Sequence, residues 1–291
     1  NRVLVIDSRP RWEYRYLRNA LMRDDDVDVR VLLLHPGMRR GDGSGYIQHF
    51  PPLERTPEQK NIPAPFTLSD FDVIFLGDVG LGPNEVTPDN ANALRKMVEH
   101  QSAGLVFMPG PLGRQLSFYN HKKQEIEQGD SLEKISRDNG IAMRTLSYAN
   151  PTVKWGSLKE GASINIPHPL ADLIPIAYDT TMPVGNWTGM SGNTGLDIPE
   201  ARFNMMPEGR ESPLLLLSKE DEATSNEELW RNVLPGFYWH ASVLRDVPGS
   251  RVLAVHDSKR NRYGYLPLIV TQPAGNGQTL FMGTDSAWRW R

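Results

Sequence analysis

Short, continuous apolar runs recur along the first third of the chain. They occupy residues 3–6, 29–34, 71–76 and 104–108 and consist largely of Val, Ile, Leu and Phe. Continuous runs of this length are typical of strands that are buried on both faces of a sheet. Residues 266–271 and 279–283 predict two further strands, and the AGNGQ turn between them is typical of a hairpin.

Two segments between these runs have helical spacing instead. Residues 10–23 place Tyr14, Leu17 and Leu21 on one stripe, with Ser8 suited to an N-cap. Residues 88–100 form a second such segment, with Thr87 suited to the N-cap. Because strands and helices alternate, the pattern predicts an α/β fold with a doubly wound, mostly parallel sheet.

The alternation weakens in two places. Residues 35–69 are rich in Gly and then Pro, and they predict a long functional loop after the second strand. Residues 113–213 mix charged, polar and Pro-rich stretches, which we interpret as an insertion or lid after the fourth strand. We expect one domain over residues 1–291, and because both ends adjoin strands we expect it to be part of a longer protein.

The composition of the chain excludes several classes of partner and of active site. The 291 residues have a formal net charge of −3, so no basic field favours nucleic acid as a partner. No apolar run approaches the roughly 20 residues of a membrane span. Cysteine is absent from the sequence, which excludes disulfides, thiolate metal ligands and cysteine nucleophiles. We expect no cofactor.

Four stretches together carry a resemblance to a known fold. They are VLVIDSRPRWEYRYLRNAL, DVIFLGDVG, GLVFMPG and the final PLIVTQPAGNGQTLFMGTDSAWRWR. They resemble the class I glutamine amidotransferase-like fold, a flavodoxin-like sheet. More narrowly, they resemble the amidotransferase-like domain of large bacterial membrane proteins, which often also carry a von Willebrand factor A domain. The resemblance implies a domain of a membrane-anchored protein at the bacterial cell envelope, whose partners are other domains of the same protein or envelope proteins.

Active members of that family hold a cysteine at a turn of type G-x-C-x-G, with a His and an acidic residue nearby. By strand order the corresponding turn here is Phe107-Met108-Pro109-Gly110. The Met108 thioether cannot act as an acyl nucleophile, and Pro109 has no backbone N–H for an oxyanion hole. The sequence therefore predicts a non-catalytic protein on this scaffold.

Polar residues follow the predicted strands at one edge of the sheet. Asp7, Asp78 and Asp285 each come just after a strand, with Ser8 and Thr284 next to two of them and Gly110 in the turn above. Ligands gather at this edge in open α/β sheets. Three carboxylates could bind a cation such as Mg²⁺, whereas the alternative is that Asp7 and Asp285 cap turns or pair with Arg9, Arg11 or Arg289.

Arginines crowd the first predicted helix. Arg9 and Arg11 lie near its N-terminus, where backbone N–H groups favour anions, so a phosphate or carboxylate ligand is one interpretation. A charged solvent-exposed face, or pairing with residues 24–26, is the other. The candidate ligand-binding residues are Asp7, Ser8, Arg9, Arg11, Asp78, Gly110, Thr284 and Asp285, with no catalytic residue and no metal ligand assigned.

Three weaker signals remain. His240 and His256 could partner a serine such as Ser8 or Ser286 in a hydrolytic triad, although G-x-S-x-G is absent from the sequence and structural roles are favoured. The GDGSG motif at residues 41–45 lacks the Lys-Ser/Thr of a phosphate-binding loop. Trp239 is expected in the core, and Trp288 and Trp290 at an interface.

The alternative to a binding module is a metal-assisted hydrolase or sugar-related enzyme that uses the strand-end carboxylates.

Overall fold

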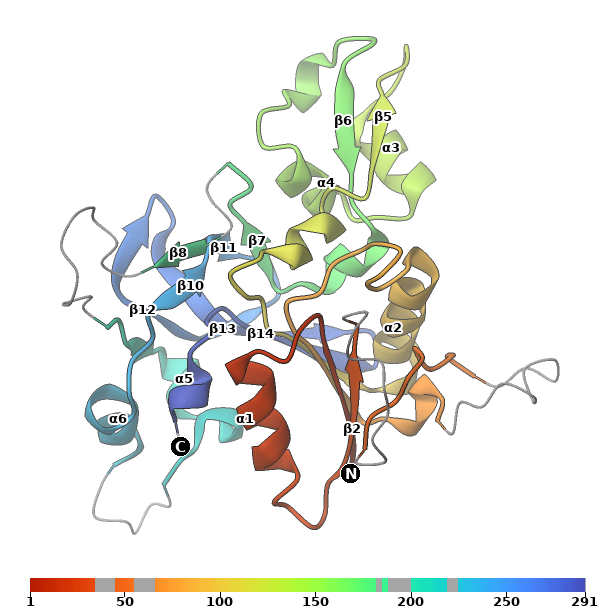
Figure 1. Ribbon diagram of the computed structural model, residues 1–291. Coiled ribbons are helices and arrows are strands. Elements are labelled where there is room, and N and C mark those ends of the chain that lie inside the picture. Colours follow the sequence, from red (N-terminus) through yellow and green to blue (C-terminus); the bar gives the residue numbers. More distant parts are fainter. Residues whose placement is uncertain (35–44, 55–65, 182–184, 188–199, 219–224, 291) are drawn as a thin grey trace.

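The computed structural model describes residues 1–34, 45–54, 66–181, 185–187, 200–218 and 225–290 (Figure 1). Most of the GDGSG motif and part of the predicted loop at 35–69 lie outside the described residues. The strands are β1 Arg2–Asp7, β2 Asp28–Leu33, β3 Val73–Leu76, β4 Gly104–Phe107, β5 Lys122–Glu125, β6 Ser163–Ile166, β7 Ile176–Tyr178, β8 Gly185–Trp187, β9 Phe203–Met205, β10 Trp239–Ala241, β11 Val243–Asp246, β12 Arg251–Asn261, β13 Gly264–Ala274 and β14 Gly277–Met282.

The α-helices are α1 Trp12–Leu21, α2 Pro88–Gln101, α3 Leu132–Asn139, α4 Met143–Ala149, α5 Pro207–Arg210 and α6 Asn226–Glu228. Three 3-10 helices matter for the site: η4 Arg114–Phe118, η6 Pro169–Leu173 and η9 Ala287–Arg289.

One large sheet organises the molecule. Its strand order is β2-β1-β3-β4-β14-β13-β12-β9. The first five strands run parallel, in the 2-1-3-4-5 order of flavodoxin-like folds. The last three pair antiparallel, so the hairpin predicted around AGNGQ is confirmed as β13–β14, with Ala274 opposite Gly277. The predicted α/β class with a mostly parallel central sheet is confirmed.

Side chains along each parallel strand point alternately to the two faces of the sheet, and each face has its own apolar core. From β1, Leu4 and Ile6 point to the face covered by α2 and η6, where Phe107 and Phe281 are also buried. Val3 and Val5 point to the opposite face, where Tyr14 of α1 packs on them. Successive strand residues face opposite sides, and both faces are apolar, which explains the continuous apolar runs of the sequence.

Helix α1 is shorter than predicted. It begins at Trp12 instead of Pro10 and ends at Leu21 instead of Arg23, and its N-cap is Arg11 instead of Ser8. The Asp7 carboxylate accepts the Ser8 N–H at 2.7 Å, which turns the chain before the helix can start. Helix α2 is close to its prediction, and Thr87 is confirmed as its N-cap because its side chain accepts the Asn90 N–H.

The region after β4 leaves the main sheet and then returns to it. Strands β5 and β6 pair with each other, and with α3 and α4 they enclose a small apolar cluster that includes Ile135 and Leu146. This unit projects from the sheet above α2 (Figure 1). The chain rejoins the sheet at β9, which pairs with β12. The assignment of residues 113–213 as an insertion or lid stays a prediction.

Candidate functional site

The carboxyl edge of the parallel strands brings together four segments that are far apart in the sequence. Asp7 ends β1, Asp78 follows β3, Met108 follows β4 and Asp285 follows β14. The four strands are neighbours in the sheet and point the same way, so these residues meet at one edge. This is the edge at which the sequence predicts a ligand site.

Arg11 occupies the centre of that edge. Its Nε donates to Asp7 Oδ2 at 2.8 Å, its Nη1 to Asp285 Oδ1 at 2.5 Å and its Nη2 to the Met108 carbonyl at 2.9 Å. The guanidinium is 15% exposed and the Asp7 carboxylate 2%. Of the two interpretations that the sequence leaves open, the structure has the one in which Asp7 and Asp285 pair with an arginine.

The charges at this edge are unequal, because one guanidinium faces three carboxylates. Burial raises the pKa of Asp7, and Arg11 only partly offsets that effect. Burial also raises the pKa of Asp285 to about 6, against the opposing effect of Arg11. Burial disfavours charged Arg11, but Asp7 and Asp285 outweigh it and raise the pKa of Arg11 above its ordinary value. Arg11 thus stays charged at any working pH, while Asp285 titrates in the mildly acidic range.

Asp78 supports the turn after β4 instead of facing open space. Its Oδ2 accepts the Leu112 N–H and its Oδ1 accepts the Arg114 N–H, both at 2.9 Å. Gly110 passes close by, because an added Cβ would lie 2.8 Å from both Arg11 Nη1 and Asp78 Oδ2. A side chain at position 110 would therefore push apart the groups that hold this edge together.

The turn after β4 does not have the form of a nucleophile elbow. It continues into the five-residue 3-10 helix η4 and not into an α-helix. Met108 is 5% exposed, and Pro109 has no N–H. Two N–H groups that follow the turn, those of Leu112 and Arg114, donate to Asp78. An oxyanion hole needs preorganised donors aimed at the reacting oxygen, and neither of these two is directed there.

The remaining candidates differ in position. Ser8 is buried, and its hydroxyl has no hydrogen-bond partner among the described residues. Arg9 is exposed to solvent. Thr284 is fully buried and donates its hydroxyl to the Trp239 carbonyl at 2.8 Å, which ties the end of β14 to β10. Asp7, Arg11, Asp78, Gly110 and Asp285 form one cluster. Arg9 contacts it only through its backbone N–H, which donates to Asp7, and the Thr284 hydroxyl bonds to Trp239 instead.

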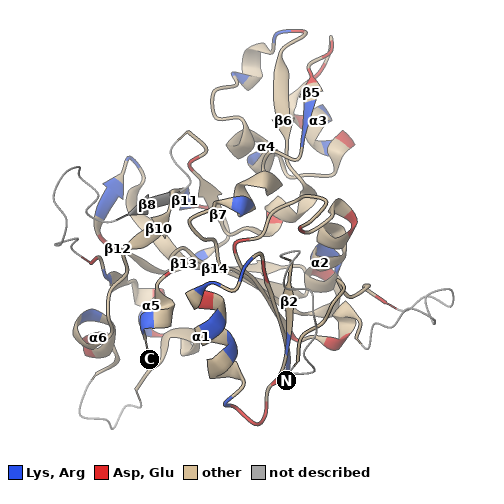
Figure 2. Ribbon diagram, in the orientation of Figure 1, with Lys and Arg blue, Asp and Glu red and all other residues tan. Residues whose placement is uncertain are grey.

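The other arginines of α1 lie over aromatic rings. The Arg15 guanidinium is 5.3 Å from the ring centre of Trp12, and that of Arg18 is 5.1 Å from the ring centre of Tyr46. Figure 2 shows basic residues along α1, with an acidic residue near its start. Pairing of these arginines with residues 24–26, one alternative from the sequence, is not what the structure has.

His240 and His256 lie together but with partners other than serine hydroxyls. Their rings are 5.1 Å apart, His240 Nε2 is 3.0 Å from Lys259 Nζ, and His256 Nδ1 is 2.9 Å from the Asp257 carboxylate. Burial lowers the pKa of His240 to about 4, so this ring is neutral at ordinary pH. Ser286 instead accepts the Tyr238 N–H. The residues proposed for a hydrolytic triad do not assemble into one.

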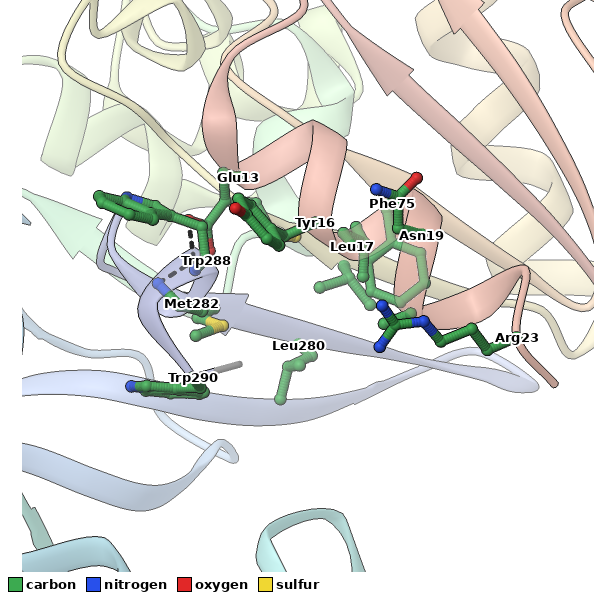
Figure 3. A pocket seen from close by; sticks show the side chains of 14 residues that line it. Glu13, Tyr16, Leu17, Asn19, Arg23, Phe75, Leu280, Met282, Trp288 and Trp290 are labelled. Atoms are coloured by element: carbon green, nitrogen blue, oxygen red, sulfur yellow. Dashed lines mark hydrogen bonds between the residues drawn. The ribbon is translucent and has the colours of Figure 1, made fainter. Parts of the chain in front are cut away.

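Glu13 was not predicted from the sequence, although it belongs to the same region. Its two carboxylate oxygens accept the N–H groups of Ala287 and Trp288, each at 3.2 Å, which fastens η9 to α1 (Figure 3). Glu13 is 2% exposed, and burial raises its pKa to about 7, with a further contribution from Asp285. A signal existed: Glu13 precedes Leu17 by four residues and so lies on the core-facing stripe.

Metal binding has little geometric support within the described part of the chain. There, no group of three or more His, Asp and Glu side chains is arranged to hold a metal ion. The cation alternative needs Asp7, Asp78 and Asp285 to turn toward a common point. In the structure the Arg11 guanidinium lies between Asp7 and Asp285, and Asp78 is engaged by backbone N–H groups.

Comparisons with known proteins identify no family from sequence. No protein-family model matches the chain, and no curated protein matches it. Among solved structures, it is similar to the cytoplasmic protein STM1381 of Salmonella typhimurium LT2, with 15% identity, a TM-score of 0.49, and coverage of 100% of this chain and 90% of that one.

Two further structures have weaker similarity. The cytoplasmic protein STM3548 of Salmonella typhimurium has 11% identity and a TM-score of 0.43, over 98% of this chain and 87% of that one. A β-galactosidase from Bacillus circulans sp. alkalophilus has 11% identity and a TM-score of 0.40, over 99% of this chain and 29% of the enzyme. Similarities at this level say nothing about activity.

The sheet described above agrees with the class I glutamine amidotransferase-like fold that the resemblance implies. The narrower resemblance, to domains of large bacterial membrane proteins, remains a prediction. None of the helices within the described residues combines the length and apolarity that crossing a bilayer requires.

Proposed function

We propose that this chain is a non-catalytic binding or interaction module built on an amidotransferase-like α/β scaffold. The observation that carries the proposal is the position of Arg11. Its guanidinium fills the carboxyl edge of the sheet, where ligands of such folds bind, and it is held there by Asp7, Asp285 and the Met108 carbonyl.

Two features of the turn after β4 support the same conclusion. Met108 supplies a thioether in place of the family's thiol, so there is no proton to remove and no acyl nucleophile to form. The N–H groups of Leu112 and Arg114 donate to Asp78 and are not free to stabilise an oxyanion. An acyl-transfer site would need a different nucleophile, free N–H donors for the oxyanion and an opening for the substrate, all at the same time.

The cellular setting that we propose comes from the resemblance alone. The module would belong to a membrane-anchored bacterial protein at the cell envelope and would bind other domains of that protein or envelope proteins. The sequence of the full-length gene product tests this part. Flanking transmembrane segments support it, and a chain without them contradicts it.

Ammonia release from glutamine tests the non-catalytic part. The purified protein should release none above the uncatalysed background. Met108→Cys should also release none, because restoring a thiol leaves Pro109 and the Arg11 ion pairs in place. Sustained release by the wild-type protein would show that the proposal is wrong, and release by Met108→Cys alone would show that the thiol was the single missing element.

A further inference from the structure

A cavity borders the carboxyl edge at Met108 and extends from there between α1, the sheet and η9 (Figure 3). It has a volume of about 460 Å³. Small-molecule sites in proteins usually measure roughly 300–1,000 Å³. The cavity is therefore large enough for a small organic ligand, and too small for a helix of another chain to enter as a whole.

The floor of this cavity is the part of the sheet that α1 leaves uncovered. Phe75 of β3, Val106 of β4, and Leu280 and Met282 of β14 form it. Leu280 and Met282 are two residues apart on one strand and so share this face. Apart from Val106, these side chains are only partly buried, although each is apolar. Further burial of such surface is favourable at about 25 cal/mol per Å².

The side walls are fixed by contacts of their own. Trp290 Nε1 donates to the Pro235 carbonyl at 2.9 Å, and its ring packs edge-on against Trp230. The Trp288 ring lies 6.2 Å from that of Tyr16, centre to centre, and Glu13 holds the Trp288 backbone. The cavity is thus largely formed before any ligand binds, which lowers the entropy cost of binding.

An acidic and a basic residue lie at opposite ends of the cavity. Glu13 lies at the end near Trp288, where its carboxylate is engaged by the backbone of η9, whereas Arg23 lies at the other end (Figure 3). Arg23 is exposed and has no ion pair within the part of the chain that the structure describes. The mouth of an apolar cavity therefore offers an uncompensated cation.

We propose that this cavity binds a small organic anion with an apolar body, such as a medium-chain acyl carboxylate. The carboxylate pairs with the Arg23 guanidinium at the mouth, and the hydrocarbon packs on Leu17, Phe75 and Leu280. The cavity touches the carboxyl edge at Met108, but the residues that would bind the ligand, Arg23, Phe75 and Leu280, lie outside the Arg11 cluster.

Titration calorimetry with decanoate and decylammonium, which share an apolar body and differ in charge, tests the proposal. The wild-type protein should bind decanoate saturably and more tightly than decylammonium. Arg23→Glu should weaken decanoate by roughly three- to tenfold, as expected for reversing one exposed charge, and should strengthen decylammonium. Arg137→Glu is the matched control, because this exposed arginine of α3 is distant from the cavity.

A second variant removes the space. Ala20 is exposed and lines the cavity, so Ala20→Phe should abolish binding of both probes while the helix stays folded by circular dichroism. Met22→Phe, just beyond the same helix and outside the lining, should leave binding unchanged. Absence of saturable decanoate binding, or affinities that neither Arg23→Glu nor Ala20→Phe alters, would overturn the proposal. So would a sedimentation mass showing a dimer that Ala20→Phe dissociates, because a second copy would then cover this face.

Discussion

Arg11 connects three segments of the chain, the most distant of which lies 274 positions from it in the sequence. It bonds to the end of β1, to the turn after β4 and to Asp285 beyond β14. Each bond joins a buried or half-buried charge to an opposite charge or a carbonyl, so each is stronger than a neutral hydrogen bond. We propose that the same guanidinium that bonds to these three segments also keeps a ligand out of this edge.

Replacing Arg11 with Met should destabilise the protein strongly. The substitution leaves Asp7 buried without its cation, which typically costs about 3–5 kcal/mol. The deficit should shrink at low pH, because a protonated carboxyl needs no counter-charge. Urea unfolding at pH 8 and pH 5 measures both effects. Arg9→Met is the control, and a loss no larger than that of this exposed residue would mean that Arg11 is not the stabilising centre.

Glu13 should make stability depend on pH. Its pKa is raised from 4.5 to about 7 in the folded protein. Between these values the folded state binds more protons than the unfolded state. The contribution of Glu13 to the free energy of unfolding is therefore fully present below about pH 4.5 and is lost as pH rises through 7. The total change is on the order of 3 kcal/mol, since one pKa unit corresponds to about 1.4 kcal/mol.

Urea unfolding between pH 4.5 and 8 measures this dependence. Glu13→Gln should flatten the curve but not abolish its slope, because Asp285 also has a raised pKa. Glu227→Gln, at an exposed position, serves as the control. If Glu13→Gln leaves the slope of the wild-type protein unchanged, the carboxyl is not titrating in this range.

Among the elements, those with a pattern of their own could be predicted and those fixed by distant contacts could not. Apolar runs and the Gly-rich turn gave β1 to β4 and the β13–β14 hairpin, because strand burial and turn chemistry are local. The start of α1 was predicted wrongly although its cause is local: the Asp7 carboxylate accepts the N–H of the next residue, and helical spacing does not reveal such a bond. The Arg11 cluster was only one of two alternatives, because pairing with Asp285 spans 274 positions.

The β13–β14 hairpin depends on Gly275. Its φ is 58°, in the left-handed region, and an added Cβ would overlap the Glu99 carbonyl at the end of α2. Gly275→Ala should therefore cost more than the 1–2 kcal/mol of the left-handed backbone alone, a range typical of non-glycine residues. Thermal or urea unfolding measures the loss.

Gly129→Ala separates the cost of the left-handed backbone from the cost of the contact with α2. Gly129 also has a positive φ, of 84°, but an added Cβ would meet nothing within 4 Å. It should lose only the backbone part. Equal losses at positions 129 and 275 would mean that contact between the hairpin and α2 contributes nothing.

At the scale of the whole molecule, one continuous sheet serves two different purposes. Its parallel half, β2 to β14, places acidic residues and Arg11 at one edge, whereas its antiparallel half pairs β12 with β9 after the chain has left and rejoined the sheet. Parallel order could be inferred from alternating strands and helices. The position of β9 could not, because a three-residue strand within a polar region has no detectable periodicity.

We propose that Arg11 closes the carboxyl edge of this sheet. A crystal structure of the protein soaked with Mn²⁺ and glutamine tests it most directly, because the metal is visible by its anomalous signal. We expect Arg11 to remain bonded to Asp7 and Asp285, with neither metal nor glutamine between them. An Mn²⁺ ion bridging Asp7 and Asp285, or glutamine seated beside Met108 with Arg11 displaced, would contradict it.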